Sequence, residues 1–320
     1  MKNLIFILIF LSFSFTALCQ GGVNFEQLTF DEALSKAKAE NKLVFMDCYT
    51  TWCAPCKYMA DNVFPREEAG EFFNPKFVSV KFDMENGEGK ELAQKFGVRA
   101  YPTFLIIRPD GSVQHRIVWG VNLDKFIEIA ERGLNVKTSF DYLDRLHEKG
   151  KMNKKQLISY QIALNDAYEE EKSNKVAQEL KSILKEKDKM QKEYWPILEK
   201  ESFGSDGFKL VLNNLSTFRK NVGKEKIDNY LFENYFSSIG ESLNADAKPH
   251  GETLKQIKSE LENLDIDGKD VLLSTIELNQ ACLMSDINKI ISIAEKINTN
   301  ENGELWSAME ALGFIKNKAS

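Results

Sequence analysis

Two cysteines that lie two residues apart constrain the fold of this chain more than any other feature. Cys53 and Cys56 follow a continuous apolar run, Leu43 to Met46, and come just before a predicted helix. Apolar runs of this length are typical of central strands that are buried on both faces. The start of a helix presents unpaired N–H groups and a partial positive charge, which favour a thiolate over a thiol. The pattern therefore predicts a reactive dithiol at a strand–helix junction.

The order of patterns over the first 134 residues predicts an α/β fold. Thr29 and Glu32 have capping-box spacing at the start of a helix that ends near Asn41. Further helical patterns lie at 90–96 and 123–134, and strand patterns at 43–46, 77–82, 103–107 and 112–119. Pro109-Asp110-Gly111 predicts a hairpin turn between the last two strands. Strands that alternate with helices and end in a hairpin predict a mixed sheet with helices on both faces.

The chain changes character near Asn135. Beyond it the strand patterns disappear, and apolar residues recur at helical spacing, as in Leu254, Ile257 and Leu261. We expect roughly eight to ten helices over 136–320, in an arrangement such as stacked helical hairpins, although no repeat signature identifies a repeat family. The sequence therefore predicts two folded domains, 20–135 and an all-helical 136–320, as its length of 320 residues also indicates.

Residues 1–19 have the pattern of a secretory signal peptide. Lys2 precedes an apolar run from Leu4 to Phe15, and Ala17-Leu18-Cys19 has the spacing of a cleavage site. Two alternatives stay open: a retained membrane anchor, for which the run is short, and a lipid-modified Cys19, for which Leu18 is a poor neighbour. We predict an exported protein that is periplasmic after removal of the leader, where disulfides persist.

Composition and residue spacing argue against two classes of site. The formal net charge of −6 does not suit a nucleic-acid binder, which normally has a basic face. A zinc site would need two ligands besides Cys53 and Cys56, and the other candidates are scattered: Cys48, Cys282, His115, His147 and His250. We therefore expect no metal. We also expect no cofactor, because a cysteine pair carries the electrons itself.

The positions of the two sulfurs predict their roles. Cys53 comes first, at the exposed end of the helix, so we expect it to attack a partner. Cys56 lies one turn further in, should be shielded, and should resolve the mixed disulfide. Asp47 is either an ordinary acid at a strand end or a buried one, and the apolar run before it favours burial. Cys48 and Cys282 are expected to be core cysteines.

The segment from about Asn24 to Leu134 resembles the thioredoxin family. Trp52-Cys53-Ala54-Pro55-Cys56-Lys57 is similar to the family's W-C-G-P-C-K, with alanine in place of glycine. Asp47 lies six residues before Cys53, as the family's buried acid does, and Lys81 matches the lysine near that acid.

Three later segments extend the resemblance. Tyr101-Pro102-Thr103 resembles the family's cis-proline loop, and Asp110-Gly111 and Trp119-Gly120 match its hairpin turn and the glycine that follows. There are also departures from the family pattern. Residues 61–76 contain an insertion after the active-site helix, and Cys48 replaces the usual aromatic residue beside the buried acid. Cys48 leaves open whether a third sulfur takes part in the redox chemistry.

The resemblance implies a thioredoxin fold and a thiol–disulfide oxidoreductase. It implies that Asp47 relays protons to or from the Cys56 sulfur, with Lys81 opposing the rise in pKa that burial causes. It implies a cis bond at Pro102, in a loop that faces the cysteines and offers a backbone edge to a substrate peptide, although Pro102 could be a turn residue only. Trp52 is expected to pack beside the sulfur and shield it.

Together these expectations describe an exported bacterial-type enzyme that exchanges disulfides with protein partners. The neighbours Pro55 and Lys57 resemble those of reducing thioredoxins, so we expect reduction rather than oxidation. Outside the cytoplasm such an enzyme must receive electrons from a membrane-bound donor. In the alternative, the helical domain binds a partner or peptide and is the functional part, while the first domain is a docking module.

Overall fold

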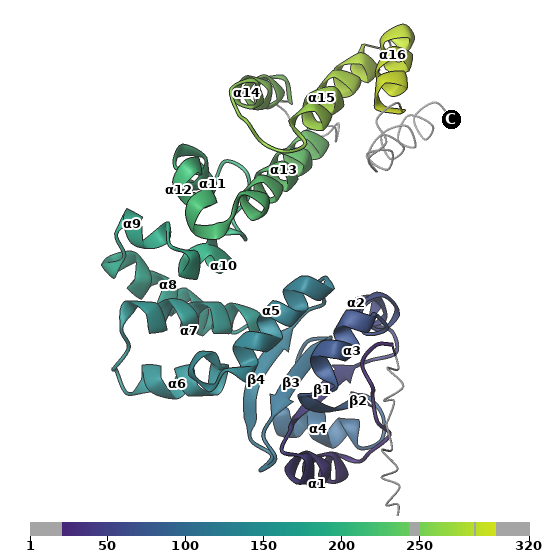
Figure 1. Cartoon of the computed structure of the whole chain (residues 1–320), viewed down its shortest axis with the longest axis vertical. Coiled ribbons are helices and arrows are strands. Elements are labelled where there is room, and N and C mark those ends of the chain that lie inside the picture. Colours follow the sequence, from purple (N-terminus) through teal and green to yellow (C-terminus); the bar gives the residue numbers. More distant parts are fainter. Residues whose placement is uncertain (1–20, 243–249, 285, 299–320) are drawn as a thin grey trace, which may run out of the picture. The chain divides into compact units, whose positions relative to one another are not determined.

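The computed structural model describes residues 21–242, 250–284 and 286–298 (Figure 1). The chain divides into two units, Met1–Ile183 and Leu184–Ser320. The predicted leader, including Cys19, lies outside the described residues, and so does the side chain of Cys282. Among the described residues, no helix combines the length and apolar character that crossing a bilayer requires.

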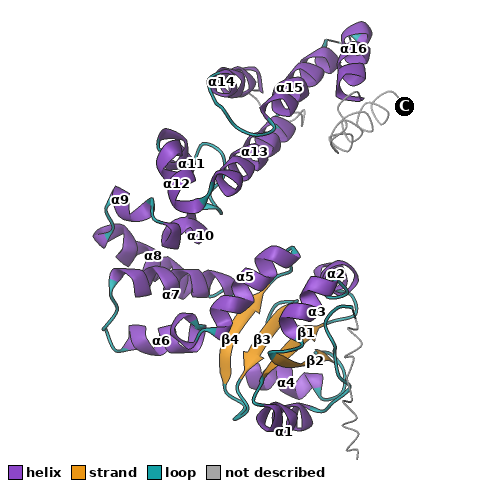
Figure 2. Cartoon of the chain, in the orientation of Figure 1, coloured by secondary structure: helices purple, strands orange, loops and turns teal. Residues whose placement is uncertain are grey.

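The first unit is built on a four-stranded mixed sheet, whose strands are orange in Figure 2. Strand β1 (Leu43–Tyr49) pairs in parallel with β2 (Phe77–Asp83) and antiparallel with β3 (Thr103–Ile107). Strand β3 in turn pairs antiparallel with β4 (Val113–Val118), which gives the order β2-β1-β3-β4. The predicted mixed α/β sheet is therefore confirmed.

Helices flank this sheet on both faces. Helix α1 begins after a capping box between Thr29 and Glu32 and ends at Asn41, which is left-handed, as the sequence predicts. A π-helix, η1, directly follows α2 and overlaps the start of the insertion predicted over 61–76. The helical elements up to Leu134 are α1 (Phe30–Glu40), α2 (Ala54–Tyr58), η1 (Met59–Val63), α3 (Glu67–Phe73), α4 (Gly89–Phe96) and α5 (Leu123–Leu134).

Alternation along β1 assigns its side chains to two apolar clusters. Val44, Met46 and Cys48 belong to a cluster with residues of α1 and α4. Phe45 belongs to a second cluster, on the opposite face, with residues of α3 and α5. Asp47 follows Phe45 by two residues and so lies on the Phe45 face, whereas Cys48 lies on the other face. This separation matters for the chemistry of the site.

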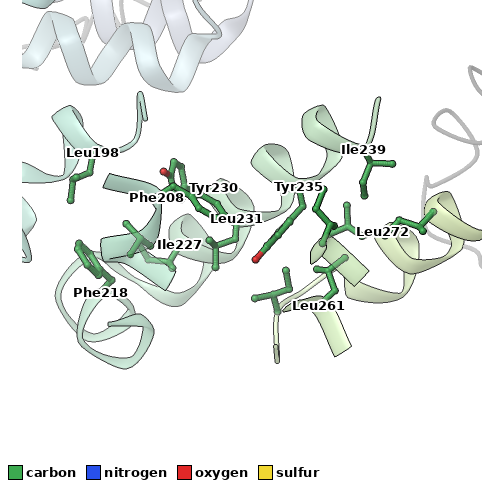
Figure 3. Close-up of a cluster of buried hydrophobic side chains, with 14 of the residues drawn as sticks. Leu198, Phe208, Phe218, Ile227, Tyr230, Leu231, Tyr235, Ile239, Leu261 and Leu272 are labelled. Carbon is green, nitrogen blue, oxygen red and sulfur yellow. The ribbon is translucent and has the colours of Figure 1, made fainter. Parts of the chain in front are cut away.

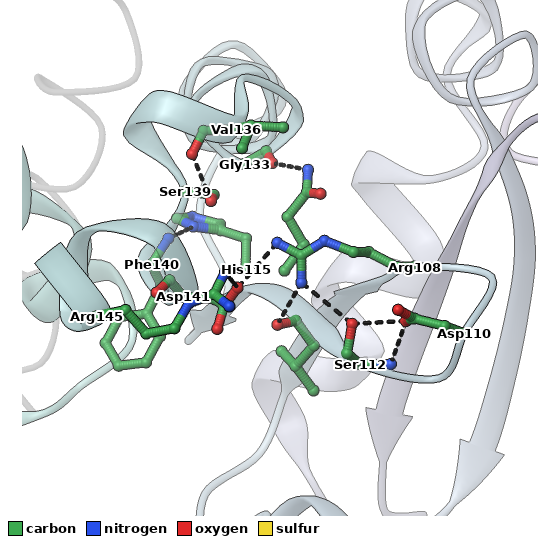
Figure 4. A network of polar contacts seen from close by, with 12 residues as sticks. Arg108, Asp110, Ser112, His115, Gly133, Val136, Ser139, Phe140, Asp141 and Arg145 are labelled. Atoms are coloured by element: carbon green, nitrogen blue, oxygen red, sulfur yellow. Dashed lines mark hydrogen bonds and ion pairs between the residues drawn. The ribbon is translucent and has the colours of Figure 1, made fainter.

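Helices beyond α5 pack on β4, which Figure 4 shows at the level of side chains. Helices α6 (Phe140–Glu148) and α7 (Lys154–Asp166) contact β4 itself, whereas η2 (Val136–Thr138) contacts α5, α6 and α7, and α8 (Glu170–Ile183) contacts α7. His115 of β4 is buried and its Nδ1 accepts a hydrogen bond from the Phe140 N–H at 3.1 Å. Burial lowers the pKa of His115 to about 4, so the ring is neutral at pH 7 and remains an acceptor.

Two ion pairs fasten the same helices to the first 134 residues. Arg108 Nη2 lies 2.9 Å from Asp141 of α6 (Figure 4), and Arg132 Nη2 lies 2.7 Å from Asp166 of α7. Asp166 is buried, so its pairing with Arg132 offsets the cost of removing a carboxylate from water. The division between units accordingly falls after α8. A boundary at 135/136 stays a prediction about which segment folds by itself.

A short segment ahead of α1 is held against the rest of the unit. The Val23 N–H donates to the Phe64 carbonyl at 2.7 Å, and Asn74 Nδ2 donates to the Gly22 carbonyl at 3.1 Å. A Cβ added to Gly70 would lie 2.3 Å from the Gly22 carbonyl oxygen, so the two backbones meet at a distance that only glycine permits. Gly22 and Val23 are therefore held firmly against the rest of the unit.

The second unit is helical throughout its described residues, which confirms the predicted change of character. Its elements are α9 (Glu186–Lys189), η3 (Lys192–Tyr194), α10 (Trp195–Leu198), α11 (Asp206–Asn213), α12 (Leu215–Val222), α13 (Lys224–Glu241), α14 (His250–Glu262), α15 (Lys269–Leu283) and α16 (Ile287–Asn298). Figure 3 shows its apolar core, in which Ile227, Leu231 and Tyr235 of α13 contact neighbouring helices. The helices described beyond residue 135 are more numerous than the eight to ten expected over 136–320. Part of the difference is that α9 and α10 are only four residues long.

We expect a fragment of residues 20–135 to fold by itself and to keep its dithiol, because both apolar clusters are formed by residues up to Leu134. It should be less stable than a fragment of residues 20–183 by about 2–3 kcal/mol, since truncation removes the contacts that α6 and α7 make to His115, Arg108 and Arg132. Urea unfolding followed by circular dichroism measures both values. Aggregation of the shorter fragment, or loss of a cooperative transition, would contradict an independent domain.

Candidate active site

Cys53 and Cys56 lie at the N-terminus of α2, shortly after β1, as the sequence predicts. They are joined in a disulfide with a Cα–Cα distance of 5.3 Å. Cys53 is the N-cap of α2, and its Sγ accepts a hydrogen bond from the Cys56 N–H at 3.1 Å. In the reduced protein the same N–H favours a thiolate on Cys53, because an N–H donor at a helix start stabilises negative charge.

Exposure does not distinguish the two cysteines in the disulfide form. Cys53 is 4% exposed and Cys56 is 7% exposed. Cys56 is buried, as expected, but the expectation that Cys53 lies exposed is wrong for this state. The physical reason is the capping geometry, which holds the Cys53 sulfur against the first turn of α2.

A small cavity connects the cysteines to a buried acid. Its volume is about 210 Å³, and its walls include Asp47, Cys53, Cys56, Lys57 and Lys81. A space of this size has room for several water molecules and has the polar groups to bind them. The carboxyl group of Asp47 and both cysteines therefore border one common space.

Asp47 is the buried acid that the sequence predicts. It is 7% exposed, and its Oδ1 accepts no hydrogen bond among the described residues. Burial raises the pKa of Asp47 from its ordinary value near 3.8 to about 7, while the positive charge of Lys81 acts in the opposite direction. Lys81 is the residue of β2 that pairs with Asp47 in the sheet. An acid of this pKa can both accept and release a proton near neutral pH.

Cys48 is separated from this cavity by the sheet itself. It is fully buried as a free thiol in the cluster formed with α1 and α4, which confirms the predicted core position. Burial raises the pKa of Cys48 well above its ordinary value, so the group stays a protonated thiol. A third sulfur in this place cannot join the Cys53–Cys56 exchange without unfolding of the sheet.

The loop before β3 and the end of β4 complete the surface around the disulfide. The Tyr101–Pro102 bond is cis, as the resemblance implies, and the Pro102 carbonyl accepts a hydrogen bond from the Trp119 N–H at 3.0 Å. A Cβ added to Gly120 would lie 3.4 Å from the Pro55 carbonyl oxygen, so this glycine lies close against α2. Residues 119–120 thus contact both the proline loop and the redox helix.

Trp52 lies at the surface. Its side chain is 67% exposed, and its role as a shield beside the sulfur stays a prediction. Its ring meets Tyr101 edge to face at 6.0 Å, and its Nε1 donates to the Glu85 carboxylate, with distances of 3.0 and 3.1 Å to the two oxygens. These contacts fix the indole as an exposed aromatic surface beside the redox pair.

Two residues of this surface were missed by the sequence analysis. Glu85 lies between β2 and α4 in a segment with no motif, so no signal in the sequence indicated that its carboxylate binds the indole of Trp52. Trp119 was noted only as the neighbour of Gly120. Its left-handed backbone, with φ of 80°, and its 43% exposure distinguish it from an ordinary strand-end residue.

Comparisons with known proteins agree with this geometry. A family model described as a thioredoxin-like domain matches residues 30–133. Thioredoxin H-type from Oryza sativa subsp. indica is 42% identical over 89 residues, which cover 28% of this chain and 67% of the rice protein. A solved structure of a proposed disulphide-isomerase from Bacteroides thetaiotaomicron is 43% identical, with coverage of 36% of this chain and 95% of that one and a TM-score of 0.34. The chain belongs to the thioredoxin family.

The thioredoxin match is confined to the first part of the chain. The thiol:disulfide interchange protein DsbD from Pseudomonas fluorescens is 31% identical over 99 residues, which cover 30% of this chain and only 17% of that protein. The chain spans 59% of thioredoxin Y from Oryza sativa subsp. japonica. Thioredoxin-family membership supports thiol–disulfide oxidoreductase activity in general, with the close Cys53–Cys56 pair as its redox centre.

Proposed function

We propose that this chain is an exported oxidoreductase that reduces disulfides of protein partners through Cys53 and Cys56. The observation that supports the proposal best is the arrangement of the capped Cys53 sulfur, Cys56 and the buried Asp47 around one small cavity. Such an arrangement supplies a nucleophile, a resolving thiol and a proton acceptor within one site.

In the proposed reaction the Cys53 thiolate attacks one sulfur of the partner's disulfide. The partner's second sulfur leaves as a thiolate and takes up a proton from water. The Cys56 thiol then loses its proton to the Asp47 carboxylate, through water in the cavity, and attacks Cys53. The partner's first sulfur leaves Cys53 as a thiolate and takes up the proton held by Asp47, so that the partner is released as a dithiol. The two electrons that it has gained come from the Cys53–Cys56 pair, which is now a disulfide.

The other predicted site residues act on this reaction indirectly. Lys81 limits the rise in the pKa of Asp47, so that the carboxyl group titrates near neutral pH. The cis-proline loop at Pro102 offers backbone groups to an extended substrate segment, and Trp52 gives the redox pair an aromatic border. These roles follow from position and from the family resemblance.

Location and direction complete the proposal. The leader pattern of residues 1–19 supports export to the periplasm, where a reductase requires electrons from a membrane-bound donor. The neighbours Pro55 and Lys57 support the reducing direction. No cofactor takes part in the proposed reaction.

Insulin reduction in the presence of dithiothreitol tests the activity, and a redox titration tests the direction. We expect wild-type protein to accelerate the precipitation of insulin chains and Cys53→Ser to have no effect above dithiothreitol alone. A reduction potential of the Cys53–Cys56 couple near −270 mV supports a reductase, and one near −120 mV an oxidant. If the isolated helical residues 136–320 bind a partner tightly while the full chain reduces no insulin, the alternative of a binding protein replaces this proposal.

A further inference from the structure

Two exposed aromatic residues with left-handed backbones meet beside the proline loop. Trp119 has a φ of 80° and Tyr168 a φ of 57°, and they are two of the three non-glycine residues with positive φ in the part of the chain that the structure describes. Their rings meet edge to face at 5.3 Å, yet Trp119 is 43% and Tyr168 48% exposed. Large side chains in this conformation are costly, and they occur mainly where function requires them.

Tyr168 occupies a position where glycine is usual. Helix α7 ends in a Schellman motif, in which the Glu169 N–H donates to the Leu164 carbonyl at 2.9 Å and the Tyr168 N–H to the Asn165 carbonyl at 3.2 Å. The left-handed residue of this motif is most often glycine, because it has no Cβ. The turn itself therefore does not explain a tyrosine at this position.

The aromatic pair is continuous with the proposed redox surface. The Trp119 N–H binds the Pro102 carbonyl, and Gly120 lies against Pro55 of the redox helix. Tyr168 comes from the turn between α7 and α8, outside the segment 30–133 that the thioredoxin model matches. The helices after α5 thus add a side chain to the border of the dithiol site.

A hollow lies next to the pair. Its volume is about 510 Å³, and it is lined by residues before and after the proline loop and by the α7–α8 turn. Its apolar walls include Phe96, Val118 and Ala167, together with the ring of Tyr168. This volume is in the range that accommodates a large side chain with its flanking backbone.

The charges around the hollow balance each other. Arg99 and Arg116 line it, and so do Glu169 and Glu170. Arg116 donates to the Phe96 carbonyl at 2.5 Å and to the Gly97 carbonyl at 3.4 Å, and Glu170 hydrogen-bonds the Tyr168 side chain. A border with equal numbers of both signs gives neither a cation nor an anion a net advantage.

We propose that Trp119, Tyr168 and this hollow bind the segment of the disulfide-bearing partner that flanks its reactive cysteine, and that they select a bulky apolar or aromatic side chain there. This inference rests on the proposed function and adds a substrate preference to it. The hollow is lined by Ala100 and Thr103, on either side of the proline loop, so an extended peptide along this loop would bring a side chain near its cysteine toward the hollow.

Short peptides with a single cysteine, blocked as the mixed disulfide with thionitrobenzoate, test this preference. The Cys53 thiolate of reduced protein attacks the peptide sulfur and releases yellow thionitrobenzoate; Cys56 then releases the peptide thiol and forms the Cys53–Cys56 disulfide. Each peptide has one variable residue, placed either two positions before or two positions after the cysteine. This residue is phenylalanine, lysine, glutamate or glycine. Stopped-flow absorbance gives the second-order rate constant for each peptide.

We expect one placement of phenylalanine to react about tenfold faster than glycine, which is within the range of one apolar contact. Lysine and glutamate should stay within about twofold of glycine, and the phenylalanine advantage should change little with salt. In Tyr168→Gly the ratio of the rate constants for the phenylalanine and glycine peptides should fall below about twofold. Tyr168→Phe should keep the advantage.

The choice of variants separates binding from folding. Tyr168→Gly restores the residue that the Schellman turn favours, so it should unfold at the same or a higher temperature than wild type. Ile183→Ala removes an equally exposed apolar side chain at the end of α8 and should change no rate. A phenylalanine advantage that is absent in wild type, or that survives in Tyr168→Gly, overturns the inference. A failure of the proposed function would give another result. In that case Cys53→Ser and wild type would release thionitrobenzoate at equal rates from every peptide.

Discussion

A Cys56→Ser protein is expected to stop halfway through the exchange and to accumulate mixed disulfides with its partners. Without the resolving thiol, the bond between Cys53 and the partner has no internal nucleophile to break it. The expected result is a set of high-mass bands on non-reducing gels that disappear on reduction, at least tenfold stronger than in wild type. Mass spectrometry of these bands then identifies the partners.

The matched control is Cys53→Ser, which should give few such bands. Because the disulfide form shows no difference in exposure between the two cysteines, the assignment of roles needs a measurement on the reduced protein. Iodoacetamide should label Cys53 well before Cys56, since the Cys56 N–H favours the Cys53 thiolate. If peptide mapping finds Cys56 or Cys48 labelled first, the assignment of the nucleophile is wrong.

Replacement of Asp47 by asparagine should stabilise the oxidised protein at pH 8 but not at pH 4. The pKa of Asp47 is raised from about 3.8 to about 7 in the folded protein, so the ionised carboxylate is less stable there than in the unfolded chain. Asp47 therefore costs no stability below about pH 4; the cost grows as the pH rises and is complete above about pH 7. From pH 4 to pH 8, the difference in unfolding free energy between Asp47→Asn and wild type should change by roughly 2–4 kcal/mol in favour of the variant.

Urea unfolding at each pH measures this change, with Asp61→Asn as the control, because Asp61 is an exposed acid on η1. The same variant tests the proton relay. Stopped-flow exchange by Asp47→Asn should be slower by about tenfold or more where Cys56 must lose its proton. A stability difference that does not vary with pH would exclude a buried, ionisable Asp47, and identical pH profiles of the exchange rate would exclude the relay.

The sheet, the helices up to Leu134 and the redox centre could be predicted because local sequence determines them. Helices α1 and α4 end at Asn41 and Gly97, the hairpin turn contains Gly111, and all three residues adopt the left-handed backbone in the structure. The short spacing between Cys53 and Cys56 leaves little freedom in their arrangement. The burial of Asp47 follows from the apolar run before it, since a residue near the end of a central strand remains covered on both faces.

Contacts between distant segments could not be predicted in this way. The hydrogen bond from Phe140 to His115, the pair of Arg132 with Asp166, and the approach of Tyr168 to Trp119 each join residues that are more than 20 positions apart. No periodic pattern marks such residues, because only the packing of α6 and α7 on β4 brings them together. The exposure of Trp52 was missed for a similar reason, since its partner Glu85 is 33 residues away.

The backbone contact between Gly22 and Gly70 determines how the protein can be attached to a surface. Because hydrogen bonds already hold the chain at Gly22 and Val23, a bead or sensor chip coupled at the exposed Gly21 is joined to the folded unit one residue from its hydrogen-bonded backbone. One residue spans at most about 3.6 Å, so such a link gives the molecule almost no freedom to rotate. Immobilised-binding measurements therefore need a flexible spacer inserted ahead of Gly21.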